Sequence, residues 1–276
     1  MKDSLQKFRI DGKIAIITGG AGLLGVQHSD AIAEAGGIPI LWDINEEIAV
    51  KHGERIKRTF NVPSMGMNVD ITDPDSVKAG LDKILSVFNH IDILINNATN
   101  DPKVEKAQAD NWSRFENYNI EMWNKDISVG LTGAFLCSQT VGTYMAKSRG
   151  GVILNIASDL GVIAPDQRIY EKKNLLEHQQ PAKPVTYSII KHGIIGLTKY
   201  LATYWADKNV RANALSPGGV YTNQDDEFVS ILTNHIPMKR MARNDEYKAA
   251  VVFLVSEASS YMTGANLIID GGRTCW

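Results

Sequence analysis

A short apolar run followed by closely spaced glycines constrains this chain more than any other feature of its sequence. Residues 13–18 read KIAIIT, and residues 19–25, GGAGLLG, follow directly. A helical pattern of apolar residues then runs to Ala35. Glycines let the backbone approach a pyrophosphate, and the first turn of a helix offers unpaired N–H groups to it. This order of strand, glycine turn and helix therefore predicts a dinucleotide-binding unit.

A second apolar run, 37–42, ends in Asp43, which lies 21 residues after Gly22. A carboxylate at this distance is suited to accept hydrogen bonds from an adenosine ribose. It would also repel a 2′-phosphate, and neither Trp42 nor Ile44 beside it carries a charge. Since the glycine loop contains no lysine or arginine, the sequence predicts NAD(H) rather than NADP(H) as the cofactor.

Apolar strand patterns alternate with helical patterns along the whole chain. Strands are expected at 13–18, 37–42, 64–68, 91–96, 151–156, 210–215 and 266–270. Helices are expected at 22–35, 45–59, 74–89, 119–147, 186–207 and 245–257. This alternation predicts an α/β fold in which a doubly wound parallel sheet lies between two layers of helices. We see no repeat or linker, so residues 1–276 are expected to form one Rossmann-type domain.

The bulk composition excludes several classes of function. A net charge of −2 gives no electrostatic case for binding nucleic acid or an anionic membrane. The first residues lack the apolar core of a signal peptide, and no apolar stretch is long enough to span a bilayer. Cys137 and Cys275 are too few for a disulfide framework, and the six histidines show no metal-binding spacing. We therefore expect a cytoplasmic protein with no metal.

Tyr187 and Lys191 stand four residues apart in an expected helix, so their side chains share one face. A free phenol has a pKa of about 10, and a neighbouring ammonium favours the phenolate and lowers that pKa. The pair therefore suits a general acid/base. Taken alone it is weak evidence, because the same spacing occurs on many solvated helices.

Several further segments resemble the short-chain dehydrogenase/reductase family, in its single-domain form, from about Phe8 to Gly272. The order and spacing of these segments together make the resemblance to this family specific. These segments are 18–25, 70–71, 96–99, 155–158, 187–191, 216–222, 261–264 and 270–272.

The resemblance implies the roles of individual residues in this chain. Tyr187 would exchange a proton with the substrate oxygen, Ser158 would hydrogen-bond that oxygen, and Lys191 would lower the tyrosine pKa and bind the nicotinamide ribose. Hydride chemistry would belong to the cofactor. The implied cofactor-binding residues are Thr18, Gly19, Gly22, Leu23, Leu24, Gly25, Asp43, Asp70, Ile71, Asn97, Ala98, Tyr187, Lys191, Pro217, Gly218, Val220 and Thr222.

Three substitutions depart from the family pattern. Gly22 stands one place before the usual glycine, which also fits the extended branch that acts on nucleotide sugars. Only 89 residues follow Tyr187, however, so we favour the short form. Gly130 replaces an asparagine whose main-chain carbonyl holds a relay water; glycine keeps the carbonyl and tolerates a kink. Thr99 replaces a glycine beside the cofactor. Its hydroxyl would face the substrate, or the substitution would only change the local packing.

An insertion at about 165–184 separates Ser158 from Tyr187 by 29 residues. Loops on a rigid scaffold usually carry specificity, so we expect it over the catalytic opening. Arg168 and Tyr170 there, with Thr99, are the candidate substrate residues, and Arg114 in the segment before the Gly130 helix is a further candidate cation. Arginines bind phosphate or carboxylate well. The insertion predicts a phosphorylated or nucleotide-linked sugar, although a solvated loop without substrate contact remains open.

The insertion and the ending GGRTCW also resemble bacterial oxidoreductases of flagellin modification and surface-sugar synthesis. That subgroup implies an amino-sugar precursor as substrate. Family membership implies a homodimer or homotetramer, with helices 119–147 and 186–207 at one interface. Two alternatives stay open: an oxidoreductase acting on a sugar alcohol, steroid or acyl ketone, and an NAD-binding regulator with impaired catalysis.

Overall fold

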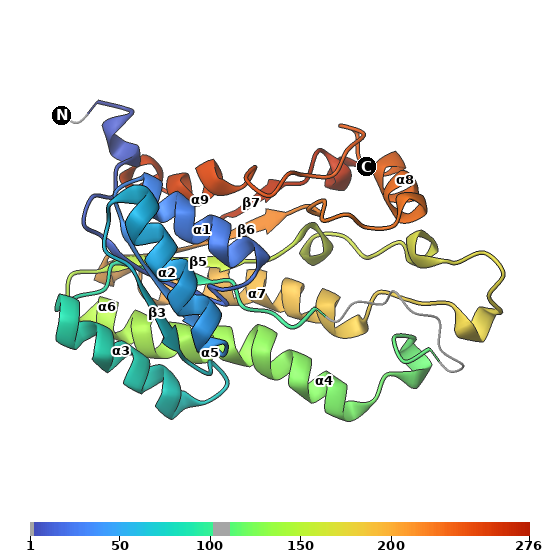
Figure 1. Ribbon diagram of the computed structural model, residues 1–276, viewed down its shortest axis with the longest axis horizontal. Coiled ribbons are helices and arrows are strands. Elements are labelled where there is room, and N and C mark those ends of the chain that lie inside the picture. Colours follow the sequence, from blue (N-terminus) through green and yellow to red (C-terminus); the bar gives the residue numbers. More distant parts are fainter. Residues whose placement is uncertain (1–2, 102–110) are drawn as a thin grey trace.

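The computed structural model describes residues 3–101 and 111–276. Its centre is a parallel sheet whose seven strands are ordered β3-β2-β1-β4-β5-β6-β7 (Figure 1). The strands are β1 Ile14–Thr18, β2 Ile38–Asp43, β3 Met65–Asn68, β4 Ile93–Asn96, β5 Gly151–Ile156, β6 Val210–Pro217 and β7 Asn266–Ile269. The predicted doubly wound fold is confirmed, and all seven strands lie within two residues of their expected ends.

The helices also follow the expected order, with one addition. They are α1 Leu23–Glu34, α2 Glu46–Phe60, α3 Pro74–Phe88, α4 Ile120–Ile127, α5 Gly133–Cys137, α6 Thr143–Lys147, α7 Val185–Tyr204, α8 Asp226–Asn234 and α9 Lys248–Val255. Two π-helical turns, Ser128–Thr132 and Ser138–Gly142, join α4, α5 and α6 into the single long run that the sequence predicts.

Helix α8 is not among the helices expected from the sequence. Asp225 caps it by accepting hydrogen bonds from the backbone N–H groups of Glu227 and Phe228. Such a cap satisfies N–H groups that a first helical turn leaves unpaired. Helix α9 is shorter at both ends than the expected range 245–257.

Alternate residues of each central strand face opposite layers of helices. In β1, Ile14 and Ile16 pack in the core that includes residues of α3 and α7, whereas Ala15 and Ile17 pack in the core with α9. Both faces of β1 are buried along its whole length. This two-sided burial explains why the strands read as continuous apolar runs.

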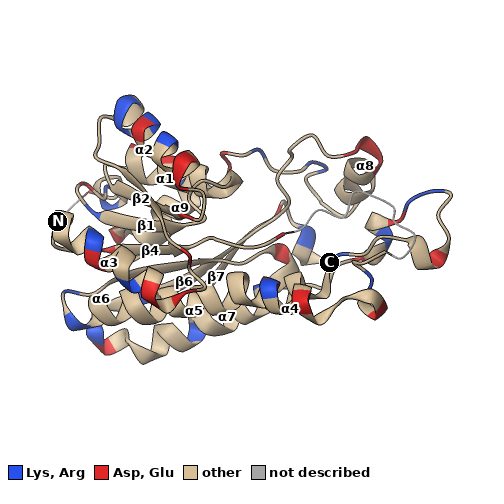
Figure 2. Cartoon of the chain, turned by 60° about the horizontal axis from the view of Figure 1, so that its bottom comes forward, with Lys and Arg blue, Asp and Glu red and all other residues tan. Residues whose placement is uncertain are grey.

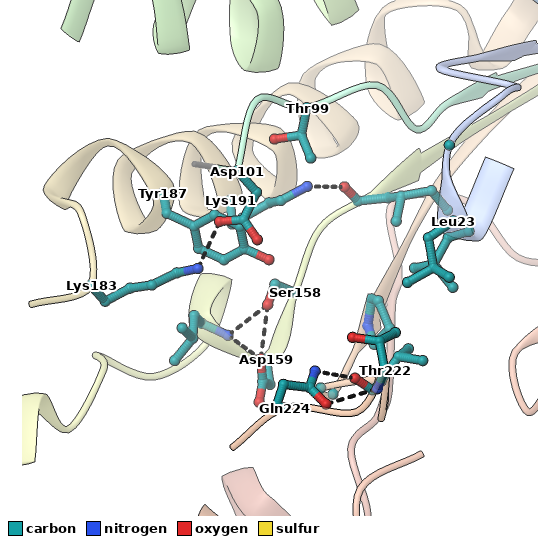
Figure 3. Close-up of a pocket in the computed structure, with 18 of the residues that line it drawn as sticks. Leu23, Thr99, Asp101, Ser158, Asp159, Lys183, Tyr187, Lys191, Thr222 and Gln224 are labelled. Atoms are coloured by element: carbon teal, nitrogen blue, oxygen red, sulfur yellow. Dashed lines mark hydrogen bonds and ion pairs between the residues drawn. The ribbon is translucent and has the colours of Figure 1, made fainter. Parts of the chain in front are cut away.

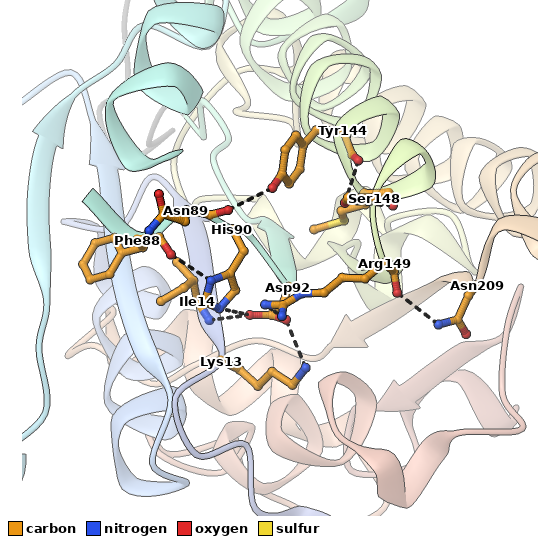
Figure 4. Close-up of polar contacts among 11 residues, drawn as sticks. Lys13, Ile14, Phe88, Asn89, His90, Asp92, Tyr144, Ser148, Arg149 and Asn209 are labelled. Atoms are coloured by element: carbon orange, nitrogen blue, oxygen red, sulfur yellow. Dashed lines mark hydrogen bonds and ion pairs between the residues drawn. The ribbon is translucent and has the colours of Figure 1, made fainter. Parts of the chain in front are cut away.

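A cluster of polar groups ties the amino ends of the central strands together (Figure 4). The buried carboxylate of Asp92, just before β4, accepts from the backbone N–H of Ile14 at 2.9 Å and from Lys13 Nζ at 3.0 Å. Arg149 Nη2, just before β5, donates to it at 3.1 Å. These contacts lie at the amino ends of the strands, whereas the candidate active site described below lies at their carboxyl ends.

The charged side chains have mixed signs over the surface. Figure 2 shows acidic and basic residues alternating along α2 and scattered over the other helices. In the described ranges no helix has the length and hydropathy needed to cross a bilayer. Those ranges also hold no group of three or more His, Cys, Asp or Glu side chains placed to bind a metal ion.

Candidate active site

A cavity with a volume of about 1010 Å³ lies at the carboxyl ends of the central strands. It extends from the glycine loop after β1 to Tyr187 on α7 and onward beneath α8. In doubly wound sheets this edge is where ligands bind. The predicted cofactor residues that line it are Gly19, Gly22, Leu23, Leu24, Asp43, Asp70, Ile71, Asn97, Ala98, Tyr187, Lys191, Pro217, Gly218, Val220 and Thr222.

The glycine loop is too tightly built for side chains at three of its positions, Gly19, Gly20 and Gly25. Gly19 has a φ of +61°, and a Cβ there would lie 2.9 Å from Ala98 Cα. At Gly25 a Cβ would lie 2.1 Å from the carbonyl oxygen of Gly19. Gly22 lines the cavity directly before α1, and the first N–H groups of a helix have no partner within the helix. The loop therefore fits the close approach of a pyrophosphate.

Asp43 reaches this loop from the end of β2. Its Oδ2 accepts a hydrogen bond from the backbone N–H of Ala21 at 3.0 Å, and Oδ1 accepts one from Asn45 at 3.0 Å. The carboxylate thus lies beside the glycine turn, where the sequence analysis expects a ribose. Further along the same edge, Asp70 is held by the backbone N–H of Thr72 at 2.8 Å.

Two of the predicted cofactor residues, Thr18 and Gly25, do not line the cavity but support the loop from behind. Thr18 Oγ1 accepts hydrogen bonds from the backbone N–H groups of Asn97 at 3.0 Å and Ala98 at 3.1 Å. This buried hydroxyl therefore joins the ends of β1 and β4.

Ser158, Tyr187 and Lys191 meet in one wall of the cavity (Figure 3). Ser158 follows β5, whereas Tyr187 and Lys191 lie one turn apart on α7. The Lys191 ammonium is 5.7 Å from the centroid of the tyrosine ring and donates to the Ile156 carbonyl at 2.9 Å. The structure thus brings together three residues that the sequence placed on two separate elements.

Burial dominates the electrostatics of this wall. It raises the pKa of the Tyr187 phenol, the Asp101 carboxylate raises that pKa further, and the hydrogen bond with Ser158 lowers it. Burial lowers the pKa of Lys191 itself to about 8, which reduces its preference for the charged form.

Asp159 and Arg273 form a buried ion pair next to Ser158. Arg273 Nη1 donates to Asp159 Oδ2 at 2.8 Å, and Ser158 Oγ donates to Asp159 Oδ1 at 2.8 Å. Both members line the cavity. Sequence reasoning missed this pair, because the two residues are 114 positions apart and nothing in either local pattern points to the other.

Lys183 and Asp101 form a second ion pair in the same cavity, which the sequence analysis also missed. Lys183 Nζ lies 2.8 Å from Asp101 Oδ1 and 3.8 Å from the centroid of the Tyr187 ring. A signal was available, since Lys183, Tyr187 and Lys191 follow one another at intervals of four residues.

The insertion at about 165–184 and helix α8 together cover the cavity, and we call these two segments the cap. Tyr170 of the insertion packs against Phe228 of α8, with ring centroids 5.7 Å apart. Lys173 of the insertion also pairs with Glu227 at the start of α8, at 2.7 Å. Tyr170 and Thr99 both line the cavity, as the substrate prediction requires.

The two arginines that the sequence analysis considered for anion binding lie elsewhere. Arg168 is 78% exposed, pairs with Asp166 at 2.7 Å and is absent from the cavity lining. Arg114 pairs with Glu116 and donates to the Glu177 carbonyl at 2.6 Å, so it anchors the insertion. The charge of Arg168 is thus paired within the insertion, and Arg114 holds the insertion from outside it through a main-chain carbonyl.

Gly130 lies in the first π-helical turn, packed against α7. A Cβ at Gly130 would lie 2.8 Å from Ile190 Cγ2, so the Ile190 side chain occupies the space that an asparagine would need. The helix is irregular at this glycine, while the expected role of its main-chain carbonyl stays a prediction.

The chain is similar to known enzymes over nearly its full length. Residues 22–274 match the family described as enoyl-(acyl carrier protein) reductase. The D-threitol dehydrogenase of Mycolicibacterium smegmatis is 34% identical, with 97% of this chain and 95% of that protein covered. The NAD-dependent glycerol dehydrogenase of Listeria innocua serovar 6a is 33% identical, with 98% and 96% covered.

The chain is also similar to a solved structure over nearly its full length. The gluconate 5-dehydrogenase of Burkholderia cenocepacia, in complex with NADP and tartrate, superposes with a TM-score of 0.85 at 28% identity. The match covers 99% of this chain and 100% of that one. The similar proteins therefore include one described as NAD-dependent and one that binds NADP, so the comparisons leave the choice of cofactor open.

Proposed function

The chain belongs to the short-chain dehydrogenase/reductase family of oxidoreductases. We propose that its substrate is a neutral sugar alcohol, and that with NAD(H) it interconverts a secondary alcohol group of this substrate and the corresponding ketone. The observation that carries this proposal is the meeting of Ser158, Tyr187 and Lys191 in the wall of a cavity that continues into the glycine loop. Two similar proteins, described as a threitol and a glycerol dehydrogenase, support a polyol as the substrate.

In this proposal the protein transfers the proton and orients the substrate and the cofactor. When bound, the nicotinamide cofactor accepts the hydride of the alcohol carbon or returns it to the ketone. During oxidation Tyr187 takes the hydroxyl proton as the phenolate, after its own proton has passed to solvent, and during reduction the phenol gives its proton to the ketone oxygen. Ser158, whose single O–H donor points to Asp159 in the structure, turns that donor to the substrate oxygen, and Lys191 holds the nicotinamide ribose hydroxyls. Asp43 accepts from the adenosine ribose, which supports NAD(H) over NADP(H).

The charges of the cavity favour a neutral substrate over an anionic one. Among the described residues, the cations that line it are Lys172, Lys183, Lys191 and Arg273. Lys183 pairs with Asp101 and Arg273 with Asp159, while Lys172 lies 3.8 Å from Asp225. A phosphorylated or nucleotide-linked amino sugar, with a role in surface-glycan synthesis, therefore becomes the competing proposal. Its remaining support is the position of the insertion over the cavity.

The test is reduction of NAD+ and NADP+, followed by absorbance of the reduced cofactor, with a panel of alcohols. The panel contains free sugar alcohols, phosphorylated and nucleotide-linked sugars, and simple monohydric alcohols. Turnover of neutral polyols with NAD+ is the expected result. Turnover confined to an anionic sugar would instead establish the competing proposal. Tight NADH binding without turnover of any member would favour a regulator with impaired catalysis.

A homodimer or homotetramer is part of the proposal. Tyr200 and Tyr204 on α7 are 61% and 60% exposed, and their rings stack with centroids 5.5 Å apart. Exposed aromatic side chains gathered on one helix are typical of a surface that is buried in an assembly. Light scattering coupled to size exclusion measures the mass directly, and a monomer would contradict this part.

A further inference from the structure

Lys183 occupies an unusual place for a lysine. Its side chain is only 12% exposed, and its ammonium lies 3.8 Å from the centroid of the Tyr187 ring, beside the phenol that would exchange the substrate proton. Asp101, which follows the end of β4, pairs with it at 2.8 Å across 82 residues of sequence. Figure 3 shows the contact between Lys183 and Asp101 beside the Tyr187 ring.

The pair keeps hydrogen-bonding capacity after its members have bound each other. An ammonium has three donors, and a carboxylate has two acceptor oxygens. In the described part of the chain, the recorded side-chain hydrogen bond of the pair uses one ammonium donor and Asp101 Oδ1. Two donors and one carboxylate oxygen are therefore left for a ligand in the cavity that both residues line.

This combination matches a hydroxyl group better than a charged group. A hydroxyl donates one hydrogen bond and accepts others, so it can donate to Asp101 and accept from Lys183 at once. A phosphate or carboxylate would meet the negative charge of Asp101, and an ammonium group would meet the positive charge of Lys183. The pair therefore selects for a neutral group with both a donor and an acceptor.

We propose that Lys183 and Asp101 form a hydroxyl-binding subsite that selects alcohols carrying a second hydroxyl on the carbon next to the reacting one. The reacting oxygen lies at the Tyr187 hydroxyl, and a substituent on the neighbouring carbon extends along the ring toward the ammonium. This subsite rests on the proposed function and adds the feature that separates a polyol from a simple alcohol.

The experiment compares two substrates that differ only in that hydroxyl, butane-2,3-diol and butan-2-ol. The ratio of their kcat/KM values with NAD+ is measured for the wild-type protein and for Lys183→Met, Lys183→Arg and Asp101→Asn. Lys57→Met is the matched control, because Lys57 makes an exposed pair with Glu54 on α2, away from the cavity. NADH binding and the thermal unfolding midpoint are recorded for each variant.

We expect Lys183→Met and Asp101→Asn each to lower the diol-to-monool ratio by about 10-fold or more, the size of one hydrogen bond to a charged group. NADH binding should be unchanged, Lys183→Arg should keep part of the ratio, and Lys57→Met all of it. If the variants lose activity equally on both alcohols, or on neither, the subsite is wrong while the proposed function stands. If the wild-type protein oxidises no alcohol with adjacent hydroxyls, the proposed function and the subsite are both overturned.

Discussion

Arg273 holds the carboxylate that in turn holds Ser158. Its Nη1 donates to Asp159 Oδ2 at 2.8 Å, and the other oxygen of Asp159 accepts the Ser158 hydroxyl at 2.8 Å. The side chains of Arg273 and Asp159 are only 9% and 4% exposed. A residue beyond the last strand therefore sets the orientation of a hydroxyl that follows β5.

Replacing Arg273 by methionine should destabilise the protein and impair turnover together. The Asp159 carboxylate would be left buried without its partner, which costs about 3–5 kcal/mol. Unfolding in urea measures this loss, and the initial rate on the preferred alcohol measures the effect on Ser158. Arg243→Met is the control, since Arg243 is 68% exposed and pairs with Asp245 at the surface. A loss no larger than that of the control would contradict the role of the pair.

Tyr187→Phe should remove most turnover and leave NADH binding intact. The variant keeps the ring and its contact with Lys183 but loses the proton-exchanging hydroxyl, and such groups contribute about 10²–10⁴-fold to rates. Cofactor fluorescence titration and initial rates measure the two properties separately. Tyr261→Phe, at a fully exposed tyrosine, is the matched control. Turnover that survives in Tyr187→Phe would show the acid/base assignment to be wrong.

Asp43→Ser should raise kcat/KM with NADP+ relative to NAD+ by about 10-fold or more, the size of one charged interaction. The substitution removes a carboxylate that would repel a 2′-phosphate at the end of β2. Rates with both cofactors on one alcohol measure the ratio, and Asp207→Ser, at a residue 72% exposed, is the control. Equal use of both cofactors by the wild-type protein would already refute the predicted NAD(H) preference.

Gly130→Asn should destabilise the protein by about 1–3 kcal/mol, because the new Cβ overlaps the Ile190 side chain. Gly196→Asn is the control: it lies on α7 with open space around the new Cβ, so it should change little. The double variant Gly130→Asn/Ile190→Ala should lose less than the sum of its single variants. Simple additivity in the free energy of unfolding would mean that Ile190 does not occupy that space.

The stability of the protein should fall at mildly acidic pH through His28. Burial lowers the pKa of His28 to about 4 from 6.5, and among the described residues neither ring nitrogen has a hydrogen-bond partner. In this pH range His28 therefore binds a proton in the unfolded chain but not in the folded one. The free energy of unfolding falls by up to about 3 kcal/mol as the pH falls from 6.5 toward 4.

His28→Leu tests this pH dependence. It should be at least as stable as the wild type at pH 7, because it removes two buried polar atoms without partners. Between pH 6.5 and 4 its free energy of unfolding should decline less than that of the wild type. Parallel curves from urea unfolding across that range would rule His28 out as the source.

The sequence by itself determined the seven strands, the helices other than α8, and their order. Apolar runs such as 13–18 and the four-residue spacing of Tyr187 and Lys191 are local patterns, and a strand or helix converts each into a predictable face. The glycine loop belongs to the same class, because its tight turn is required by the local backbone. The seven strands, the long helix before β5 and the cavity residues of the loop were all predictable on this basis.

Only the tertiary structure decided which distant side chains meet. Asp159 and Arg273 are 114 residues apart, and Asp101 and Lys183 are 82 apart, so no periodicity links them. Arg168 and Arg114 differ from these pairs, because their partners Asp166 and Glu116 are near them in the sequence; what the fold decided is that neither arginine lines the cavity. Local spacing specifies a helix or a strand, but burial and charge pairing depend on which surfaces the fold brings into contact.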